Sequence, residues 1–120
     1  MLEYIGATTV TLHENAATTG NGTIVDTGGR FATAVVQITG TMGVVTFKGT
    51  IDGKTWVNLA CTSLTTGATT ATAAAIGIYS VPVPGLLRFK AEITTHTGGD
   101  ARISAIGNFL PVVSVVNATD

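Results

Sequence analysis

The stretch from Val44 to Leu59, VVTFKGTIDGKTWVNL, constrains the fold more than any other part of the chain. Two runs rich in β-branched and aromatic residues flank Asp52-Gly53. Asp-Gly between such runs is a strong hairpin signal, because a tight turn needs positive φ and glycine supplies it without strain. The stretch therefore predicts two antiparallel strands that fold back on each other.

The length of the hairpin loop decides which side chains meet. Phe47 and Ile51 share one face of the first strand, and an even-numbered loop places Trp56, the only tryptophan, on that same face. Gly49 would then leave room for the indole. An odd-numbered loop would shift the register and separate these side chains. We expect the even register, with a fold-anchoring hairpin made by Phe47, Ile51, Asp52, Gly53 and Trp56.

The rest of the chain alternates with a two-residue period. The clearest case is 86–95, where Leu87, Phe89, Ala91 and Ile93 are expected inside and Arg88, Lys90 and Glu92 outside. Residues 62–75 are rich in Thr, Ala and Gly and predict a long loop with at most one weak edge strand; a helix at 71–76 is disfavoured by the interleaved threonines. Strands recurring roughly every ten residues, without a helix, predict an all-β, antiparallel, jelly-roll-like β-sandwich.

At 120 residues the chain is most simply one domain. We expect an N-terminal arm at 1–7, the sandwich at 8–110 and a C-terminal arm at 111–120. The nearly continuous apolar run 109–116 predicts either a final core strand or an arm that pairs with a neighbouring subunit. The candidate assembly contacts are Leu2, Tyr4, Ile5, Phe109, Leu110, Val112, Val113, Val115 and Val116.

Composition points to a covered surface. Charged residues make up 11% of the chain, against about 25% in ordinary globular domains, and the mean hydropathy is +0.46. So few charges favour a protein that is partly covered in an assembly. The net charge of −1 gives no footprint for nucleic acid or an anionic membrane. The chain start lacks the basic and apolar pattern of a signal peptide, which predicts synthesis in the cytoplasm without secretion.

The residues that usually carry chemistry are scattered. His13 and His96 have no metal-ligand spacing and are expected to be exposed loop or strand-end residues. Cys61 is expected in the core. Three aspartates lie at predicted turns, where the side chain caps its own backbone. These are Asp26, Asp52 and Asp100. The sequence therefore predicts no catalytic residues, no metal site and no cofactor.

Three runs carry a resemblance to a known family. They are VTFKGTIDGKTW at 45–56, GIYSVPVPG at 77–85 and RFKAEIT at 88–94, followed by the turn at 98–99. Together they resemble small β-sandwich virion proteins of tailed bacteriophages, and the hairpin alone is also similar to galactose-binding-like jelly rolls. The phage resemblance implies a capsid decoration (cement) protein or an accessory subunit of the head or tail. It implies the major capsid protein or other virion subunits as partners, location in the virion, and a homo-oligomer, for which we expect a trimer.

The sequence and the resemblance together favour two functions. The first is a non-enzymatic virion structural protein, most simply a capsid decoration protein that binds and stabilises the phage head. The alternative is a carbohydrate-binding or adhesin-like module of a phage tail or head fibre, with Trp56 or Tyr79 as a stacking platform for a surface glycan. An enzyme comes third.

Overall fold

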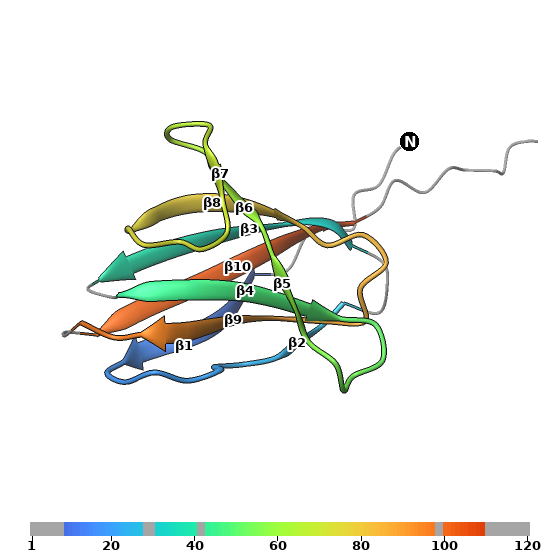
Figure 1. Cartoon of the computed structure of the whole chain (residues 1–120), viewed down its shortest axis with the longest axis horizontal. Helices are drawn as coiled ribbons and strands as arrows, with labels where there is room; N and C mark the ends of the chain where they lie inside the picture. Colours follow the sequence, from blue (N-terminus) through green and yellow to red (C-terminus); the bar gives the residue numbers. More distant parts are fainter. Residues whose placement is uncertain (1–8, 28–30, 41–42, 98–99, 110–120) are drawn as a thin grey trace, which may run out of the picture.

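The protein is an all-β sandwich of two antiparallel sheets, as the alternation predicts (Figure 1). The computed structural model describes residues 9–27, 31–40, 43–97 and 100–109. Within these ranges the chain forms ten strands and no helix. The strands are β1 (Thr9–Ala16), β2 (Val25–Asp26), β3 (Phe31–Gly40), β4 (Val44–Thr50), β5 (Val57–Leu59), β6 (Cys61–Ser63), β7 (Thr69–Thr70), β8 (Gly77–Pro82), β9 (Arg88–Thr95) and β10 (Ala101–Phe109).

The larger sheet has the order β1-β10-β3-β8-β6-β7, and the smaller sheet has the order β2-β9-β4-β5. In the larger sheet β10 lies between β1 and β3, so the last described strand is enclosed by earlier ones. The predicted arms at 1–7 and 111–120 lie outside the described residues, and their boundaries stay predictions.

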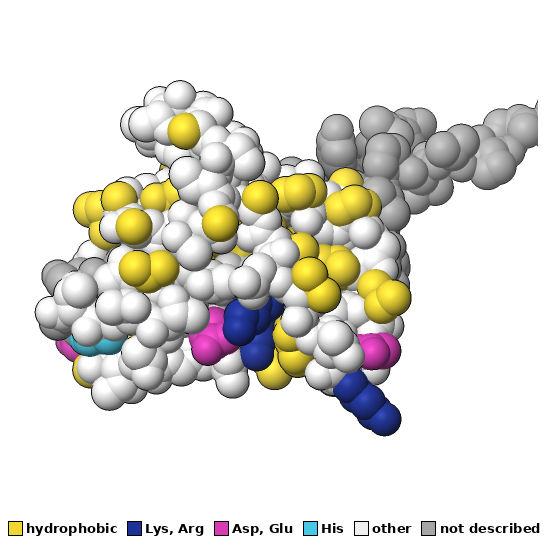
Figure 2. Space-filling view, in the orientation of Figure 1, with side chains coloured by type: hydrophobic (Ala, Val, Ile, Leu, Met, Phe, Trp, Pro, Cys, Tyr) yellow, Lys and Arg dark blue, Asp and Glu magenta, His cyan; other side chains and the backbone are white. Residues whose placement is uncertain are grey.

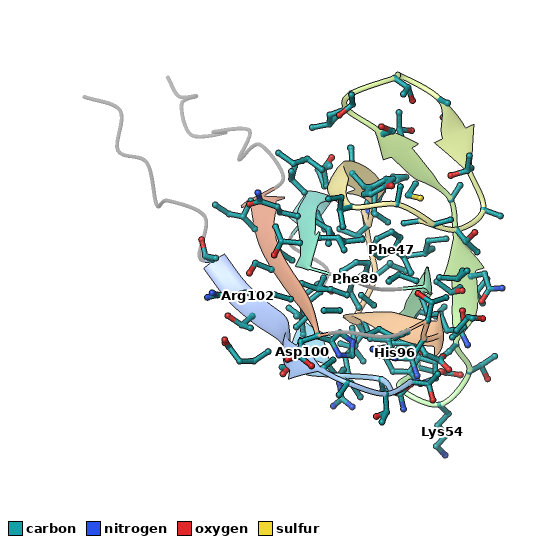
Figure 3. All side chains as sticks on the ribbon, turned by 90° about the vertical axis from the view of Figure 1, so that its left-hand side faces the viewer. Phe47, Lys54, Phe89, His96, Asp100 and Arg102 are labelled. Carbon is teal, nitrogen blue, oxygen red and sulfur yellow. The ribbon has the colours of Figure 1, made fainter. Side chains whose placement is uncertain are left out.

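The core fills the space between the two sheets, where the labelled Phe47 and Phe89 lie (Figure 3). Their rings stack at 6.1 Å between centroids with an interplanar angle of 11°. Ala91 and Ile93 are fully buried, as the alternation of 86–95 predicts. Leu87, also expected inside, is 36% exposed because it lies in the loop before β9. Its amide there donates a hydrogen bond to the Thr50 carbonyl at 2.8 Å.

The expected register of the hairpin is wrong. Phe47 pairs with Leu59 and Gly49 with Val57, which leaves an odd number of residues in the connection. Trp56 therefore belongs to the opposite face of the sheet from Phe47. Ile51 is 75% exposed in the turn and joins no core cluster. The space above Gly49 is taken by the side chains of Leu86 and Leu59 rather than by the indole.

The turn itself explains the odd register. Asp52 Oδ1 accepts hydrogen bonds from the amides of Lys54 and Thr55, both at 2.8 Å, and from the Thr50 hydroxyl at 2.9 Å. These bonds hold the carboxylate in its charged form and lower the pKa of Asp52 to about 2. Gly53 adopts a φ of 79°. The aspartate thus caps a wider turn than the two-residue loop that Asp-Gly alone suggests.

Irregular segments cover the edges of the smaller sheet. Ala73 exchanges two backbone hydrogen bonds with Val45, on the edge of β4 that β5 leaves open. Gly20 does the same with Ile93 on the edge of β9 beyond β2. Such coverage protects unpaired backbone groups from other chains. The segment 62–75 contains no helix and the short edge strand β7, but its first two residues also belong to β6, a strand that the expected loop does not include. Cys61 is fully buried, as predicted.

Candidate functional site

The outer face of the smaller sheet carries a cluster of polar and aromatic side chains, which we call the Trp56 site. It consists of Trp56, Lys90, Lys48, Glu92 and Asn21. Lys48 and Lys90 are directly opposite each other on β4 and β9, and Glu92 lies two residues further along β9. Figure 2 shows basic and acidic side chains beside each other on this face, over β4 and β9. The site exists because the odd hairpin register brings Trp56 to this side.

Lys90 is the centre of the Trp56 site. Its Nζ lies 4.4 Å from the centroid of the Trp56 ring and donates a hydrogen bond to Asn21 Oδ1 at 3.0 Å. The sequence predicts that Lys90 points to solvent; it does point away from the core, but it is only 8% exposed because the indole and Asn21 cover it. Lys48 and Glu92 form an ion pair at 2.7 Å and stay partly exposed. Lys90 forms no ion pair with any described residue.

The two histidines serve the fold. His13 is 7% exposed, so the expectation of an exposed residue is wrong. A register shift between Thr11 and His13 in β1 disrupts the alternation there, and both Leu12 and His13 are buried. His13 Nε2 is 2.7 Å from the Ala91 carbonyl oxygen, which only accepts, so this nitrogen carries the proton. His96 Nε2 contacts the Ala16 carbonyl at 3.3 Å.

A metal centre has no support in the described ranges. No group of three or more His, Cys, Asp or Glu side chains comes together in this part of the chain. Of the three aspartates expected at turns, Asp52 caps its own turn, whereas Asp26 is the last residue of strand β2. The same residues also contain no helix long and apolar enough to cross a membrane.

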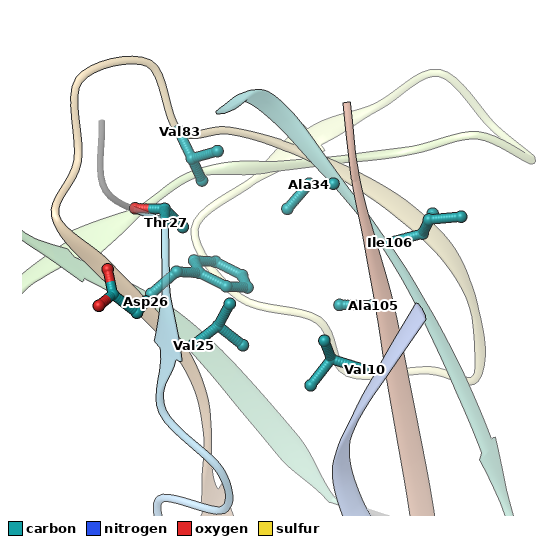
Figure 4. Close-up of a pocket in the computed structure, with 10 residues that line it drawn as sticks. Val10, Val25, Asp26, Thr27, Ala34, Val83, Ala105 and Ile106 are labelled. Atoms are coloured by element: carbon teal, nitrogen blue, oxygen red, sulfur yellow. The ribbon is translucent and has the colours of Figure 1, made fainter. Parts of the chain in front are cut away.

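An apolar cavity of about 190 Å³ opens at one end of the sandwich, between the two sheets (Figure 4). Val10, Val25 and Phe89 line it, and Ala105 also points into it, whereas the neighbouring Ile106 points away (Figure 4). No sequence pattern predicted this cavity. The sequence feature that could have indicated the cavity is a set of small residues on adjacent strands, because small side chains leave space between the sheets. These are Ala34, Ala105 and Gly107.

The cavity lies where the described chain begins and ends. Thr9 of β1 pairs with Ile106, and Phe109, the last residue of β10, pairs with Phe31. The other predicted assembly contacts lie outside the described residues. These are Leu2, Tyr4, Ile5, Leu110, Val112, Val113, Val115 and Val116. For Phe109 the backbone shows that the apolar run starts inside the last strand.

The two aromatic residues considered as stacking platforms have different environments. Tyr79 is 7% exposed, and its hydroxyl donates to the Ala75 carbonyl at 2.7 Å, so its ring belongs to the core. Trp56 is only partly buried on the outer face. The structure therefore leaves Trp56 as the one of the two that can meet a ligand.

Comparison with known proteins decides the family. The XepA family model matches residues 6–106. The chain belongs to the XepA family. No curated protein sequence matches it significantly. Two solved structures share the fold of this XepA-family chain at 20% sequence identity.

The first of these structures is the SPBc2 prophage-derived protein YomS, with a TM-score of 0.76 over 90% of this chain and 99% of YomS. The second is the PBSX exported protein XepA, with a TM-score of 0.82 over 89% of this chain. The chain spans 39% of the length of that XepA structure. YomS is described as prophage-derived and the PBSX XepA as exported, and at 20% identity both likenesses show a shared fold.

Proposed function

We propose that this protein is a non-enzymatic structural protein of a phage particle, most simply a decoration protein that binds and stabilises the head. The proposal rests on an apolar cavity at the end of the sandwich where Thr9 and Phe109 lie. The cavity lies beside β1 and β10, the strands next to which the predicted arms at 1–7 and 111–120 follow in the sequence. Membership in the XepA family and the fold shared with the prophage-derived YomS support the same function.

The cavity offers a place for an apolar side chain to bind. A volume of about 190 Å³ with an apolar lining has room for an aliphatic side chain, and filling it would remove apolar surface from water. Contact between subunits through such a cavity and through strand edges buries surface across the joints of a particle. The outer surface adds exposed apolar side chains. These include Ile51, Val57, Leu64 and Ile76.

Deletion of residues 111–120 tests the proposal. The shortened protein is expected to keep the far-UV circular dichroism of a β-sandwich and to lose co-sedimentation with phage heads. A matched control replaces 111–120 with a Gly/Ser segment of equal length, which separates side-chain contacts from chain length. Co-sedimentation that survives both changes would sink the proposal. Sedimentation equilibrium of the intact protein then tests the expected trimer.

A carbohydrate-binding module is the second candidate, favoured by the position of Trp56 on the outer face. An aromatic ring beside lysine, glutamate and amide groups is an arrangement that stacks on a sugar and holds its hydroxyls. The PBSX relative is an exported protein, which fits contact with a cell surface. Titration with surface glycans tests this function through the emission of the single tryptophan: a saturable change supports it, and a flat response contradicts it.

A further inference from the structure

Among the described residues, the buried positive charge of the Trp56 site has no negative partner. Lys90 is 8% exposed, and its ammonium contacts an amide oxygen of Asn21 and the Trp56 ring. The carboxylate of Glu92, two residues along β9, is paired with Lys48 instead. A charge removed from water is costly unless an opposite charge or several hydrogen bonds compensate it. The described part of the site thus contains two lysines but only one glutamate, which pairs with Lys48.

We infer that this face binds an oxyanion carried by a saccharide, a carboxylate or phosphate group that pairs with Lys90 while the sugar ring packs beside Trp56. The inference rests on the carbohydrate-binding candidate and names its ligand class as acidic sugars.

Each side chain of the site has a part in this recognition. The ammonium of Lys90 has three N–H donors, of which one is directed to Asn21 Oδ1 at 3.0 Å, so donors remain for an anion. Attraction between opposite charges is stronger where protein excludes water, as it does around this nearly buried lysine. The uncovered part of the Trp56 ring offers apolar surface to the C–H groups of a sugar.

The ion pair beside the centre adds specificity. Glu92 neutralises Lys48 at 2.7 Å, which keeps this neighbouring lysine from competing with Lys90 for the anion. Because both members of the pair are partly exposed, they are also placed to exchange hydrogen bonds with sugar hydroxyls. A neutral sugar would satisfy those hydrogen bonds but leave the charge of Lys90 uncompensated.

The test compares tetragalacturonate with its methyl ester, which keeps the sugar backbone and removes the charge, by titration of Trp56 fluorescence. Glucose 6-phosphate against glucose forms the phosphate arm. We expect an acidic ligand to bind at least tenfold more tightly than its neutral counterpart, with affinity falling as salt is added. The arm that shows this preference identifies the oxyanion.

Two variants assign the binding to the site. Lys90→Met keeps the aliphatic stem beneath the indole and removes the charge, and it should reduce acid-sugar affinity at least tenfold. Lys54→Met removes a lysine from the exposed turn of the same hairpin and should leave the affinity unchanged. Replacing a buried charge with an apolar side chain is often neutral for stability, and a thermal melt confirms that Lys90→Met is folded.

The outcomes distinguish the acidic-sugar inference from the carbohydrate-binding candidate on which it rests. Equal binding of the acidic and neutral sugars would overturn the inference and leave the carbohydrate-binding candidate standing. No binding of any sugar would overturn both. Acid-sugar binding that persists in folded Lys90→Met would overturn the assignment to this lysine.

Discussion

The odd register of the hairpin can be tested by comparing two truncations, Phe47→Ala and Trp56→Ala. Phe47 is fully buried between the sheets and packs against Phe89 at 6.1 Å and Tyr79 at 6.3 Å between ring centroids. Trp56 lies on the outer face and contacts Lys90. The register therefore predicts that the smaller aromatic residue matters more for folding than the larger one.

The expected losses follow from these environments. Truncation of a fully buried Phe costs about 3–5 kcal/mol in free energy of unfolding, through lost burial and the cavity that remains. Trp56→Ala loses a cation–π contact of about 0.5–1 kcal/mol and part of the indole's burial. It also returns Lys90 to water, which offsets some of that loss. We expect Trp56→Ala to cost about 1–2 kcal/mol in total.

Urea unfolding followed by far-UV circular dichroism measures both variants, since it does not depend on the tryptophan. At a slope of about 2 kcal/mol per molar urea, Phe47→Ala should lower the midpoint by about 2 M and Trp56→Ala by less than about 1 M. Phe47→Leu, which keeps most of the apolar volume, is the control and should fall between wild type and Phe47→Ala. Equal losses for the two alanine variants, or a larger loss for Trp56→Ala, would refute the register.

Two further predictions concern the turns. Because the pKa of Asp52 is lowered to about 2 from 3.8, its carboxylate stabilises the fold above pH 3.8, and this contribution is lost as the pH falls toward 2. The difference in free energy of unfolding between wild type and Asp52→Asn should therefore shrink as the pH falls from about 5 to about 2, a range that includes both pKa values. Urea titrations at several pH values measure this difference, and a difference independent of pH contradicts the role of the carboxylate. Gly40 and Gly67 have nearly the same φ, 80° and 78°, but an added Cβ would lie 2.1 Å from the Asp100 carbonyl oxygen at Gly40 and within 4 Å of nothing at Gly67. Gly67→Ala should cost about 1–2 kcal/mol for the left-handed backbone alone, and Gly40→Ala at least about 1 kcal/mol more; equal costs in thermal unfolding would argue against the close backbone approach.

The sequence predicted less of the candidate site than of the fold. Alternation at 86–95 identifies the outward position of Lys90 but not the indole that covers it. Asn21 comes from the segment between β1 and β2, far away in the sequence, and no local pattern links it to β9. The cavity likewise depends on how small residues of separate strands face each other across two sheets.

The histidine at position 13 shows a related limit. A two-residue period assigns alternate faces to Leu12 and His13, yet both are buried because β1 contains a register shift against β10. Such a bulge depends on the partner strand as well as on the local sequence. The alternation of the chain therefore predicted that β1 is a strand but not which of its side chains are inside.

By itself, the sequence determined the all-β class, the antiparallel strands, the turn at Asp52-Gly53 and the buried positions of Phe89, Ala91, Ile93 and Cys61. These follow from local periodicity and turn chemistry, which neighbouring residues express without reference to the rest of the chain. Only the tertiary structure decided on which face Trp56 lies, because one residue more or less in a loop moves every following side chain to the other face. That single step separates a tryptophan in the core from a tryptophan beside Lys90 on the surface.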